Sequence, residues 1–282
     1  MAPRVALVTG ASSGIGAATA RALAAHGWLV YASARCPESV QGLASHGLRP
    51  LALDVTDDAS MTAAVQVVES AHEAVDLLVN NAGFGLNGPV EELDMAEVRR
   101  QFATNVFGLV RMCQLVLPAM RQKRAGRIIN IGSIGGTFTT PGAGAYHASK
   151  WAVEAVNDAL RYEVQSFGVE VVLIQPTGVY TQFDRKIAET VRDTGAHSPY
   201  AAFKANHVRV TQQMFTGRNV AGIVRAEDVA AIIVRAATVA RPQTRYKVGA
   251  SAHVYSTLRR LVSDRTWDRL MALQFPMEVG TR

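Results

Sequence analysis

Two residues able to exchange a proton, Tyr146 and Lys150, stand four positions apart in the sequence YHASK, thirteen residues after Ser133. Residues four apart share one face of a helix, so the lysine ammonium would lie beside the tyrosine phenol. An adjacent positive charge lowers the pKa of a phenol from about 10 toward working pH. Tyr146 could then donate a proton to a ketone oxygen, or take one from an alcohol, while Ser133 holds that oxygen by a hydrogen bond. The YxxxK spacing alone is weak evidence, because any exposed helix can carry it.

The other titratable residues nearby carry less weight. His147 follows Tyr146 directly, but one step along a helix turns a side chain about 100° away, so a packing or solvent role is expected. The two cysteines, Cys36 and Cys113, have no partner pattern, and no His, Asp or Glu cluster has metal-ligand spacing. The sequence therefore predicts no metal site, and its cysteine usage is typical of a reducing, cytoplasmic location.

A glycine-rich loop, TGASSGIG at residues 9–16, follows the apolar run Val5–Val8. Gly10 permits a tight turn, Gly14 the close approach of a phosphate, and Gly16 close packing of a helix. A helix that begins here would aim free backbone N–H groups and its positive end at an anion. The alternative is a glycine turn without a ligand. The loop residues expected to contact a cofactor are Gly10, Ser12, Ser13, Gly14, Ile15 and Gly16.

Two later strand ends favour a nucleotide over a plain turn. Asp54 and Val55 follow one predicted strand, where a carboxylate could accept a hydrogen bond from an adenine amino group. Asn81, Ala82 and Gly83 follow the next, where small residues leave room for a ribose or nicotinamide.

These residues need a scaffold that brings strand ends together. The predicted strands are Val5–Val8, Leu29–Ala32, Pro50–Leu53, Leu77–Val79, Arg127–Ile131, Val169–Ile174 and Arg245–Val248. The predicted helices are Ile15–His26, Asp57–Glu73, Met95–Arg121, Ala145–Phe167 and Ala226–Ala240. Apolar runs alternating with helical patterns predict an α/β fold. We expect one doubly wound, Rossmann-like parallel sheet of about seven strands, with helices on both faces and ligands at the carboxyl ends of its strands.

Residues 1–282 are expected to form a single domain, because no linker or repeat interrupts them. Residues 181–225 are polar, irregular and helix-leaning, and are expected to form a substrate loop. Residues 251–275 carry apolar side chains at three- and four-residue spacings, which predicts one C-terminal helix. That helix could lie on a membrane surface, since several arginines accompany the apolar stripe, but packing on the domain or on another subunit is the preferred interpretation.

TGASSGIG, LDV, NNAG and YxxxK, in this order and with the right element between each, resemble the short-chain dehydrogenase/reductase family over about Val5 to Thr181. The resemblance implies a nicotinamide cofactor and a catalytic tetrad of Asn105, Ser133, Tyr146 and Lys150. It implies that Asn105, in ATNVFG, supports a water relay to Lys150, and that Tyr146 and Lys150 also contact the cofactor. The bland alternative for Asn105 is a solvent-facing helix residue, which its apolar neighbours disfavour.

The stretch Pro176 to Thr181 resembles the family segment Pro-Gly-x-x-x-Thr, which grips the nicotinamide carboxamide. Pro176, Val179 and Thr181 are the implied contacts. Thr177 stands where the family has glycine, so the local backbone geometry is the point at which this chain departs from the pattern.

The residue that follows the second strand favours NADP(H) over NAD(H). An acidic residue at this edge would accept a hydrogen bond from the ribose 2′-hydroxyl and repel a 2′-phosphate. Here Arg35 takes the position, and no acid follows until Glu38. Arg35 could pair with a 2′-phosphate, with Ser13 beside it. The alternative is that Arg35 is a solvated turn residue.

A hydrophobic small-molecule ketone or alcohol is the expected substrate, because apolar side chains crowd the loops around the site. The residues expected to contact it are Ser133, Ile134, Phe84, Phe138, Tyr180 and Phe183. NAGFGLNGPVEEL (81–93), GRIINIGSIGG (126–136) and ARPQTRYKVG (240–249) resemble the branch with 17β-hydroxysteroid dehydrogenase type 1 and retinol dehydrogenases, which implies a steroid- or retinoid-like substrate. A 3-ketoacyl thioester reductase and a non-catalytic NADP(H) sensor remain alternatives.

Charge and hydropathy limit the partners. The 282 residues carry a net charge of +6, but no Lys/Arg run with interleaved aromatics points to nucleic acid. No apolar stretch approaches the ~20 residues that cross a bilayer, and the start of the chain lacks the design of a signal peptide. The resemblance implies a homodimer or homotetramer, formed through helices Met95–Arg121 and Ala145–Phe167.

Overall fold

Seven parallel strands form one sheet in the order β3-β2-β1-β4-β5-β6-β9. The computed structural model describes residues 3–42, 44, 47–181, 191, 198–216 and 222–275. The strands are β1 (Val5–Val8), β2 (Leu29–Ala34), β3 (Arg49–Ala52), β4 (Leu77–Asn80), β5 (Gly126–Ile131), β6 (Val169–Pro176) and β9 (Arg245–Val248). The strand order reverses between β1 and β4, which opens a crevice at the carboxyl ends of these two strands. The predicted Rossmann-like sheet is confirmed.

Both faces of the sheet are covered, which explains why its central strands β1 and β4 are buried along their whole length. In β1, Ala6 and Val8 belong to one core cluster, while Val5 and Leu7 belong to the other. All four are buried, since successive side chains of a strand point to opposite faces. A continuous apolar run is therefore what this position requires.

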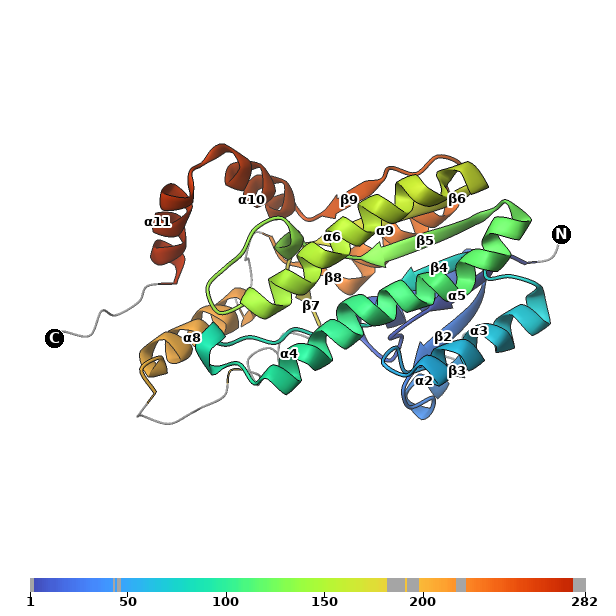
Figure 1. Cartoon of the computed structure of the whole chain (residues 1–282), viewed down its shortest axis with the longest axis horizontal. Coiled ribbons are helices and arrows are strands. Elements are labelled where there is room, and N and C mark those ends of the chain that lie inside the picture. Colours follow the sequence, from blue (N-terminus) through green and yellow to red (C-terminus); the bar gives the residue numbers. More distant parts are fainter. Residues whose placement is uncertain are drawn as a thin grey trace.

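Helices fill the two outer layers (Figure 1). On one face lie α1 (Gly14–Ala25) and α9 (Ala226–Thr238), which contact each other. On the other lie α3 (Asp58–His72), α5 (Gly108–Lys123) and α6 (Gly144–Val164). The predicted helices are thus confirmed with small shifts at their ends, and the structure adds the short α2 (Glu38–Gln41).

The helix predicted at Met95–Arg121 has three parts: α4 (Met95–Phe102), a π-helical turn (Ala103–Phe107) and α5. The whole run, Met95–Lys123, is long and apolar enough to cross a membrane by length and composition, so the expectation that no stretch reaches this limit was wrong. Met112, Val116 and Met120 are fully buried against the sheet. That face of α5 is part of the core, which accounts for its apolar composition.

Several elements lie beyond the carboxyl ends of the strands (Figure 1). They are β7 (Val179–Tyr180), α8 (Ala201–Thr216), β8 (Val224–Arg225), α10 (Ala250–Leu261) and α11 (Asp264–Gln274). Strands β7 and β8 pair in parallel and so join the two ends of the segment expected to be the substrate loop.

The single C-terminal helix predicted at residues 251–275 was wrong, because the chain forms α10 and α11. Val262 is extended, and the Ser263 hydroxyl caps α11 by accepting a hydrogen bond from the backbone N–H of Thr266. Trp267 and Met271 of α11 pack on Phe138, so the preferred interpretation, packing on the domain, is confirmed for this face.

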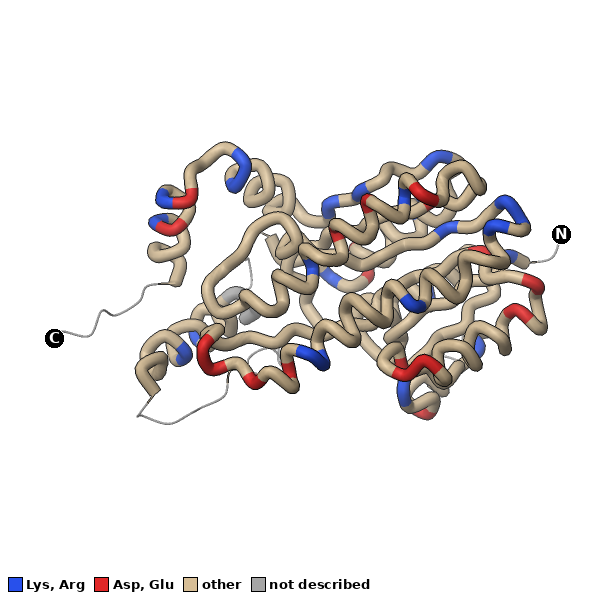
Figure 2. Tube along the Cα trace, in the orientation of Figure 1, with Lys and Arg blue, Asp and Glu red and all other residues tan. Residues whose placement is uncertain are grey.

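Charged residues are spread over the molecule. Figure 2 shows Lys and Arg interspersed with Asp and Glu along most elements. On α6, for example, Arg161 pairs with Asp158 one turn away. The surplus of positive charge is therefore distributed over the described part of the chain.

Candidate active site

The glycine loop has the backbone that its composition predicts. Gly10 and Gly14 adopt φ angles of +66° and +54°, which residues with a Cβ atom rarely adopt. At Gly16, a Cβ atom would lie 2.3 Å from the backbone oxygen of Gly10. These three glycines are therefore required by the turn and by the close approach of α1 to it.

Asn81 and Thr9 hold the loop in place. The Thr9 hydroxyl accepts hydrogen bonds from the backbone N–H groups of Asn81 (2.9 Å) and Ala82 (3.0 Å). The Asn81 side-chain amide donates to the carbonyl oxygens of Thr9 (2.9 Å) and Gly10 (3.0 Å). The Asn81 side chain thus supports the phosphate loop from β4, a role that its position beside the predicted ribose site did not indicate.

The start of α1 fits the diphosphate of a nicotinamide dinucleotide. Ser13 is the N-cap residue, yet within the described part of the chain no side chain caps the helix, and its first turn has no acid. Ser12 and Ser13 are exposed. Uncapped N–H groups at an accessible helix start attract an anion. The residues present therefore fit the group, with Ile15 on the inner side of the same turn.

A basic and an acidic residue follow the strands β2 and β3, respectively. Arg35 follows β2 and is exposed. Oδ1 of Asp54 accepts hydrogen bonds from the backbone N–H (2.9 Å) and the hydroxyl (2.7 Å) of Thr56, which fixes the carboxylate. Val55 next to it is buried and packs in the core.

Tyr146 and Lys150 share one face of α6, as their spacing predicts. The Lys150 ammonium nitrogen lies 5.9 Å from the centre of the Tyr146 ring and donates a 2.8 Å hydrogen bond to the carbonyl oxygen of Ile131, the last residue of β5. Burial lowers the pKa of Lys150 to about 8, and the charge of Glu154 opposes this shift.

Ser133 lies two residues beyond β5, at the start of a 3₁₀ turn (Ile134–Gly136) that packs against α6. Its hydroxyl oxygen accepts a 3.0 Å hydrogen bond from the backbone N–H of Gly135 and is partly accessible. Because this bond uses the oxygen as an acceptor, the hydroxyl hydrogen is available to a substrate oxygen.

Asn105 is buried in the π-helical turn, so the solvent-facing alternative was wrong. Its side-chain oxygen accepts from the backbone N–H of Phe84 (3.0 Å), and its amide donates to the Phe84 carbonyl (2.9 Å) and to the Ser149 hydroxyl (3.0 Å). The Ser149 hydroxyl in turn donates to the Tyr146 carbonyl (2.7 Å). Asn105 therefore links the loop after β4 to the turn of α6 that carries Tyr146. π-helical turns of this kind are frequent at functional sites.

His147 has the packing role that its position on the helix predicts. It is buried, its Nδ1 accepts a 3.2 Å hydrogen bond from the backbone N–H of Thr140, and burial lowers its pKa to about 4. Its ring makes an edge contact with Phe138. A neutral, buried imidazole in these contacts supports the loop at residues 137–143.

The side chain of Thr177, where the family has glycine, is accommodated by two neighbouring glycines, Gly222 and Gly249. Its backbone N–H donates to Val248 (3.0 Å), and its hydroxyl donates to the carbonyl oxygen of Gly222. A Cβ atom on Gly249 would lie 2.2 Å from the Thr177 methyl carbon. Gly249 thus makes the space that a glycine at position 177 would have supplied. Thr181, at the end of the segment, lies against Gly14, where a Cβ atom would approach its methyl carbon to 3.2 Å.

The predicted substrate contacts separate into different environments. Phe84 is partly buried, with the Arg100 guanidinium 4.4 Å above its ring. Phe138, with Ile134 beside it, packs under α10 and α11. Tyr180 is exposed in β7, and Phe183 lies outside the described residues. The structure therefore groups Ile134 and Phe138 but does not bring all of the predicted contacts to one wall.

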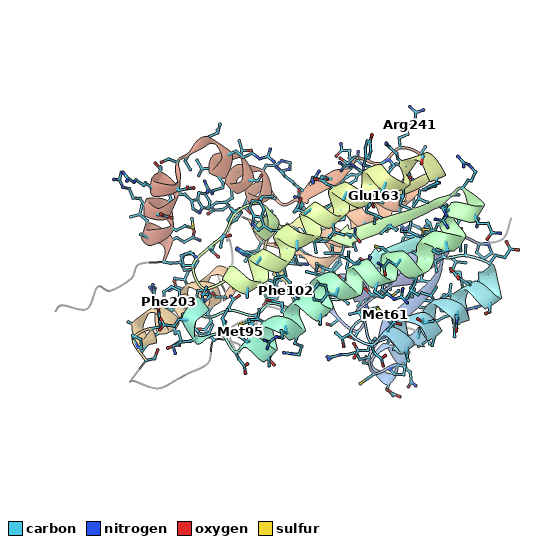
Figure 3. All side chains as sticks on the ribbon, viewed as in Figure 1. Met61, Met95, Phe102, Glu163, Phe203 and Arg241 are labelled. Atoms are coloured by element: carbon cyan, nitrogen blue, oxygen red, sulfur yellow. The ribbon has the colours of Figure 1, made fainter. Side chains whose placement is uncertain are left out.

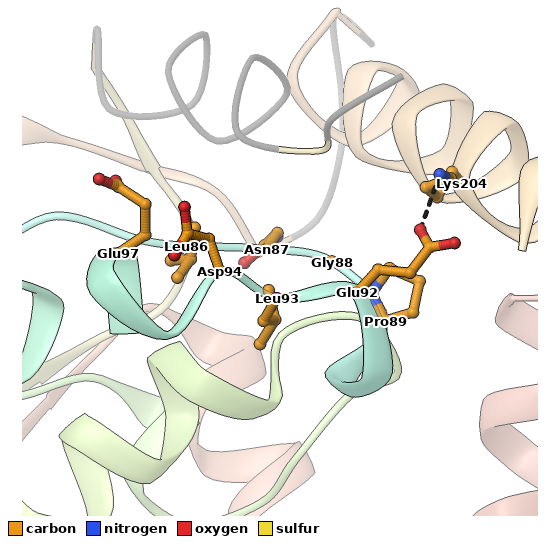
Figure 4. A pocket seen from close by; sticks show the side chains of 9 residues that line it. All are labelled: Leu86, Asn87, Gly88, Pro89, Glu92, Leu93, Asp94, Glu97 and Lys204. Carbon is orange, nitrogen blue, oxygen red and sulfur yellow. Dashed lines mark hydrogen bonds and ion pairs between the residues drawn. The ribbon is translucent and has the colours of Figure 1, made fainter. Parts of the chain in front are cut away.

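An ion pair and a hydrogen bond join the start of α8 to Glu91 and Glu92, which follow β4. These two contacts were not predicted from the sequence. The Lys204 ammonium pairs with the Glu92 carboxylate at 2.8 Å at a small pocket of about 20 Å³ (Figure 4). The Tyr200 hydroxyl donates to Glu91 at 2.6 Å. The partners are an acidic pair after a proline and a tyrosine and a lysine at the start of α8, and more than 100 residues separate the two groups in the sequence.

The parallel sheet carries a glycine loop and a polar crevice where its strand order reverses, and a Tyr–Lys pair lies at the same carboxyl edge. Together these features define a nucleotide-dependent oxidoreductase. Residues 4–192 match the short chain dehydrogenase family, and the chain belongs to that family. It is an oxidoreductase that uses a nicotinamide cofactor and acts on a small-molecule substrate. The chain is 44% identical to a 3-ketodihydrosphingosine reductase from Bacteroides thetaiotaomicron, over 71% of this chain and 73% of that one.

Solved structures agree with this assignment. A short-chain dehydrogenase from Streptomyces avermitilis superposes with a TM-score of 0.77 at 32% identity, over 96% of this chain and 97% of that one. A metagenomic short-chain oxidoreductase in complex with NADP has a TM-score of 0.68 at 28% identity, over 87% and 96% of the two chains.

Proposed function

We propose that the chain is an NADP(H)-dependent oxidoreductase that interconverts a ketone and a secondary alcohol on a bulky hydrophobic substrate. The observation that carries the proposal is the placement of Lys150 against Tyr146 on α6, beside the turn that begins at Ser133. Residues 181–225 cover the site in this proposal, and residues 1–282 act as one domain.

Each side chain has a defined task in the reduction. The Ser133 hydroxyl donates a hydrogen bond to the ketone oxygen and so orients it. The nicotinamide, when bound, supplies the hydride. The Tyr146 phenol gives its proton to the developing alkoxide, and the adjacent Lys150 ammonium stabilises the phenolate that remains. Asn105 keeps Tyr146 in place through Ser149. The oxidation of an alcohol reverses these proton transfers.

NADP(H) is the proposed cofactor because a guanidinium, and not a carboxylate, follows β2. Arg35 would pair with the 2′-phosphate, while the start of α1 holds the diphosphate and Asp54 the adenine. A neighbouring structure in this family binds NADP, which supports this choice.

Two chemical classes of substrate fit the proposal. The resemblance of three sequence stretches to the branch with 17β-hydroxysteroid dehydrogenase type 1 and retinol dehydrogenases favours a steroid- or retinoid-like substrate. The relative named 3-ketodihydrosphingosine reductase, at 44% identity, favours a ketone on a long alkyl chain with a polar head group. We place the long-chain 3-keto lipid first, because that relative is 44% identical over 71% of this chain.

The test is the loss of NADPH absorbance at 340 nm, with NADH in parallel. The carbonyl substrates are 3-ketodihydrosphingosine, steroid ketones, medium-chain ketones, a 3-ketoacyl thioester and the aldehyde retinal. Turnover of a bulky ketone that falls by about 10²–10⁴ in Tyr146→Phe, with NADPH binding unchanged, is expected. Turnover of the thioester alone would support the reductase alternative. Tight NADPH binding with no turnover across the panel would support the sensor alternative.

A further inference from the structure

A second polar cluster lies on α6 one turn beyond Lys150, outside the residues assigned to the reaction. At its centre is Glu154, whose side chain is only 13% exposed. Oε1 of Glu154 accepts a 2.7 Å hydrogen bond from the Gln175 amide on β6, and Oε2 accepts a 3.2 Å hydrogen bond from Arg245 on β9. These contacts fix a carboxylate inside the domain. A buried carboxylate held this firmly acts on the charges near it.

Glu154 and Lys150 are four residues apart on α6 and therefore lie on the same face. Gly136 packs into the turn between them, since a Cβ atom there would lie 2.8 Å from Cγ of Glu154 and 2.9 Å from the Lys150 carbonyl oxygen. Lys150 reaches the end of β5, and Gln175, the partner of Glu154, lies on the adjacent strand β6. The two charges thus lie over neighbouring strands, Lys150 buried and Glu154 with only 13% of its side chain exposed.

We propose that Glu154 is a positioning residue that sets the proton affinity of the Tyr146–Lys150 pair and thereby the pH range of the reaction. The inference rests on the proposed function of that pair. Glu154 touches neither the substrate nor the reacting atoms in this proposal, and it acts only through its charge.

The sign of the effect follows from electrostatics. A negative charge opposes the loss of a proton from any nearby group, so it favours both the Lys150 ammonium and the protonated Tyr146 phenol. Burial lowers the pKa of Lys150 to about 8, and Glu154 acts against that shift. Burial raises the pKa of the Glu154 carboxyl, while the Gln175 hydrogen bond and the Arg245 charge oppose the rise.

The other charges around Glu154 do not cancel it. On α6 they are Lys150 and Asp158, and β9 adds Arg245 and Lys247. Arg245 is shared, because it also donates to Asp158 at 2.5 Å, and Lys247 donates to the Ser256 hydroxyl at 2.6 Å. Without Glu154 these four charges sum to +2, and with the Glu154 carboxylate the five charges sum to +1. Glu154 therefore offsets the surplus of positive charge that burial makes unfavourable next to Lys150.

Glu154→Gln tests the proposal, because the amide keeps the shape and removes the charge. The measurement is the pH dependence of kcat/KM for the ketone with NADPH and for the alcohol with NADP⁺. We expect both profiles to shift to lower pH by about one unit. Glu154→Asp keeps the charge and should restore most of the wild-type profile. Glu163→Gln is the matched control, since Glu163 is an exposed carboxylate farther along the same helix (Figure 3).

If kcat/KM of Glu154→Gln falls equally at every pH, and neither limb of the pH profile moves, the proposal is overturned and Glu154 is a structural residue. A wild-type protein without turnover would count against the proposed function alone. In that case the ionisation of Tyr146 is read at 295 nm as the difference between each variant and the same variant carrying Tyr146→Phe. A midpoint lowered by Glu154→Gln supports the inference, and an unchanged midpoint refutes it.

Discussion

Arg35 illustrates how a single side chain selects a cofactor. Its guanidinium is exposed, and no hydrogen bond or ion pair joins it to the part of the chain that the structure describes. Arg35 therefore places a positive charge at the carboxyl end of β2. An acidic residue at the same position would select NAD(H). A guanidinium binds a phosphate through two parallel hydrogen bonds, so its contribution to affinity depends on the 2′-phosphate being present.

We therefore predict that Arg35→Asp exchanges the cofactor preference. The kcat/KM for NADPH should fall about 10- to 100-fold, as the loss of hydrogen bonds to a charged group implies. The value for NADH should change little or rise. Arg241→Asp alters the net charge equally at an exposed arginine before β9 and is the control (Figure 3). Equal losses with NADPH and NADH in Arg35→Asp would contradict the assignment.

The residues that act through local spacing were predictable from the sequence. Tyr146 and Lys150 share a helix face because they are four apart, and the glycines of residues 9–16 need their backbone angles whatever surrounds them. Asn81, Ser149 and Glu154 were not predicted in their present roles. Asn81 holds Gly10 from 71 residues away, Ser149 bonds to Asn105 44 residues away, and Glu154 is fixed by Gln175 21 residues away. A single sequence does not contain such pairings.

His147 connects a residue to the stability of an element. It packs α6 against the loop at residues 137–143, and burial lowers its pKa to about 4, below the value of about 6.5 in an unfolded chain. A histidine with a depressed folded pKa stabilises the fold only above the unfolded value. As pH falls from about 6.5 toward 4, the unfolded chain takes up a proton that the folded chain cannot, so stability is lost.

The predicted loss is on the order of 2 kcal/mol between pH 7 and pH 5. It is measured as the change in the free energy of unfolding by urea at the two pH values. His147→Asn should remove a loss of this size, and His207, whose pKa burial also lowers, contributes in the same direction. His26→Asn, at an exposed histidine, should leave the difference unchanged. An identical pH dependence in His147→Asn and the wild type would refute the account.

At the scale of elements, strands were easier to predict than helix ends. All seven strands of the main sheet were predicted to within two residues of their ends, and in the central strands burial on both faces demands the apolar runs that indicated them. The break between α10 and α11 was missed, since the apolar spacing continues across Val262 and Ser263 and only the capping hydroxyl interrupts the helix. The π-helical turn was also missed, and its buried Asn105 bonds to Phe84, 21 residues away in the chain.

Three large aromatic side chains lie exposed on the surface of the molecule instead of in its core. Phe107 is 64% exposed, and on α6 Trp151 is 50% and Tyr162 77% exposed. Trp151 and Tyr162 are eleven residues apart, three helical turns, and so lie on one face of α6. Exposed aromatic residues on adjacent long helices are typical of an interface between protein chains.

We predict that this face joins two copies of the chain. Light scattering after gel filtration should give a mass of at least twice the 30.2 kDa of one chain. Tyr162→Arg places a charge on each side of the two-fold axis and should shift the protein toward the monomer, because burying unpaired like charges costs several kcal/mol. Leu273→Arg changes an equally exposed apolar residue on α11 and should leave the mass unchanged. A wild-type protein that elutes at 30.2 kDa would show that α5 and α6 do not form the interface. Dissociation by Leu273→Arg instead would move the interface to the C-terminal helices.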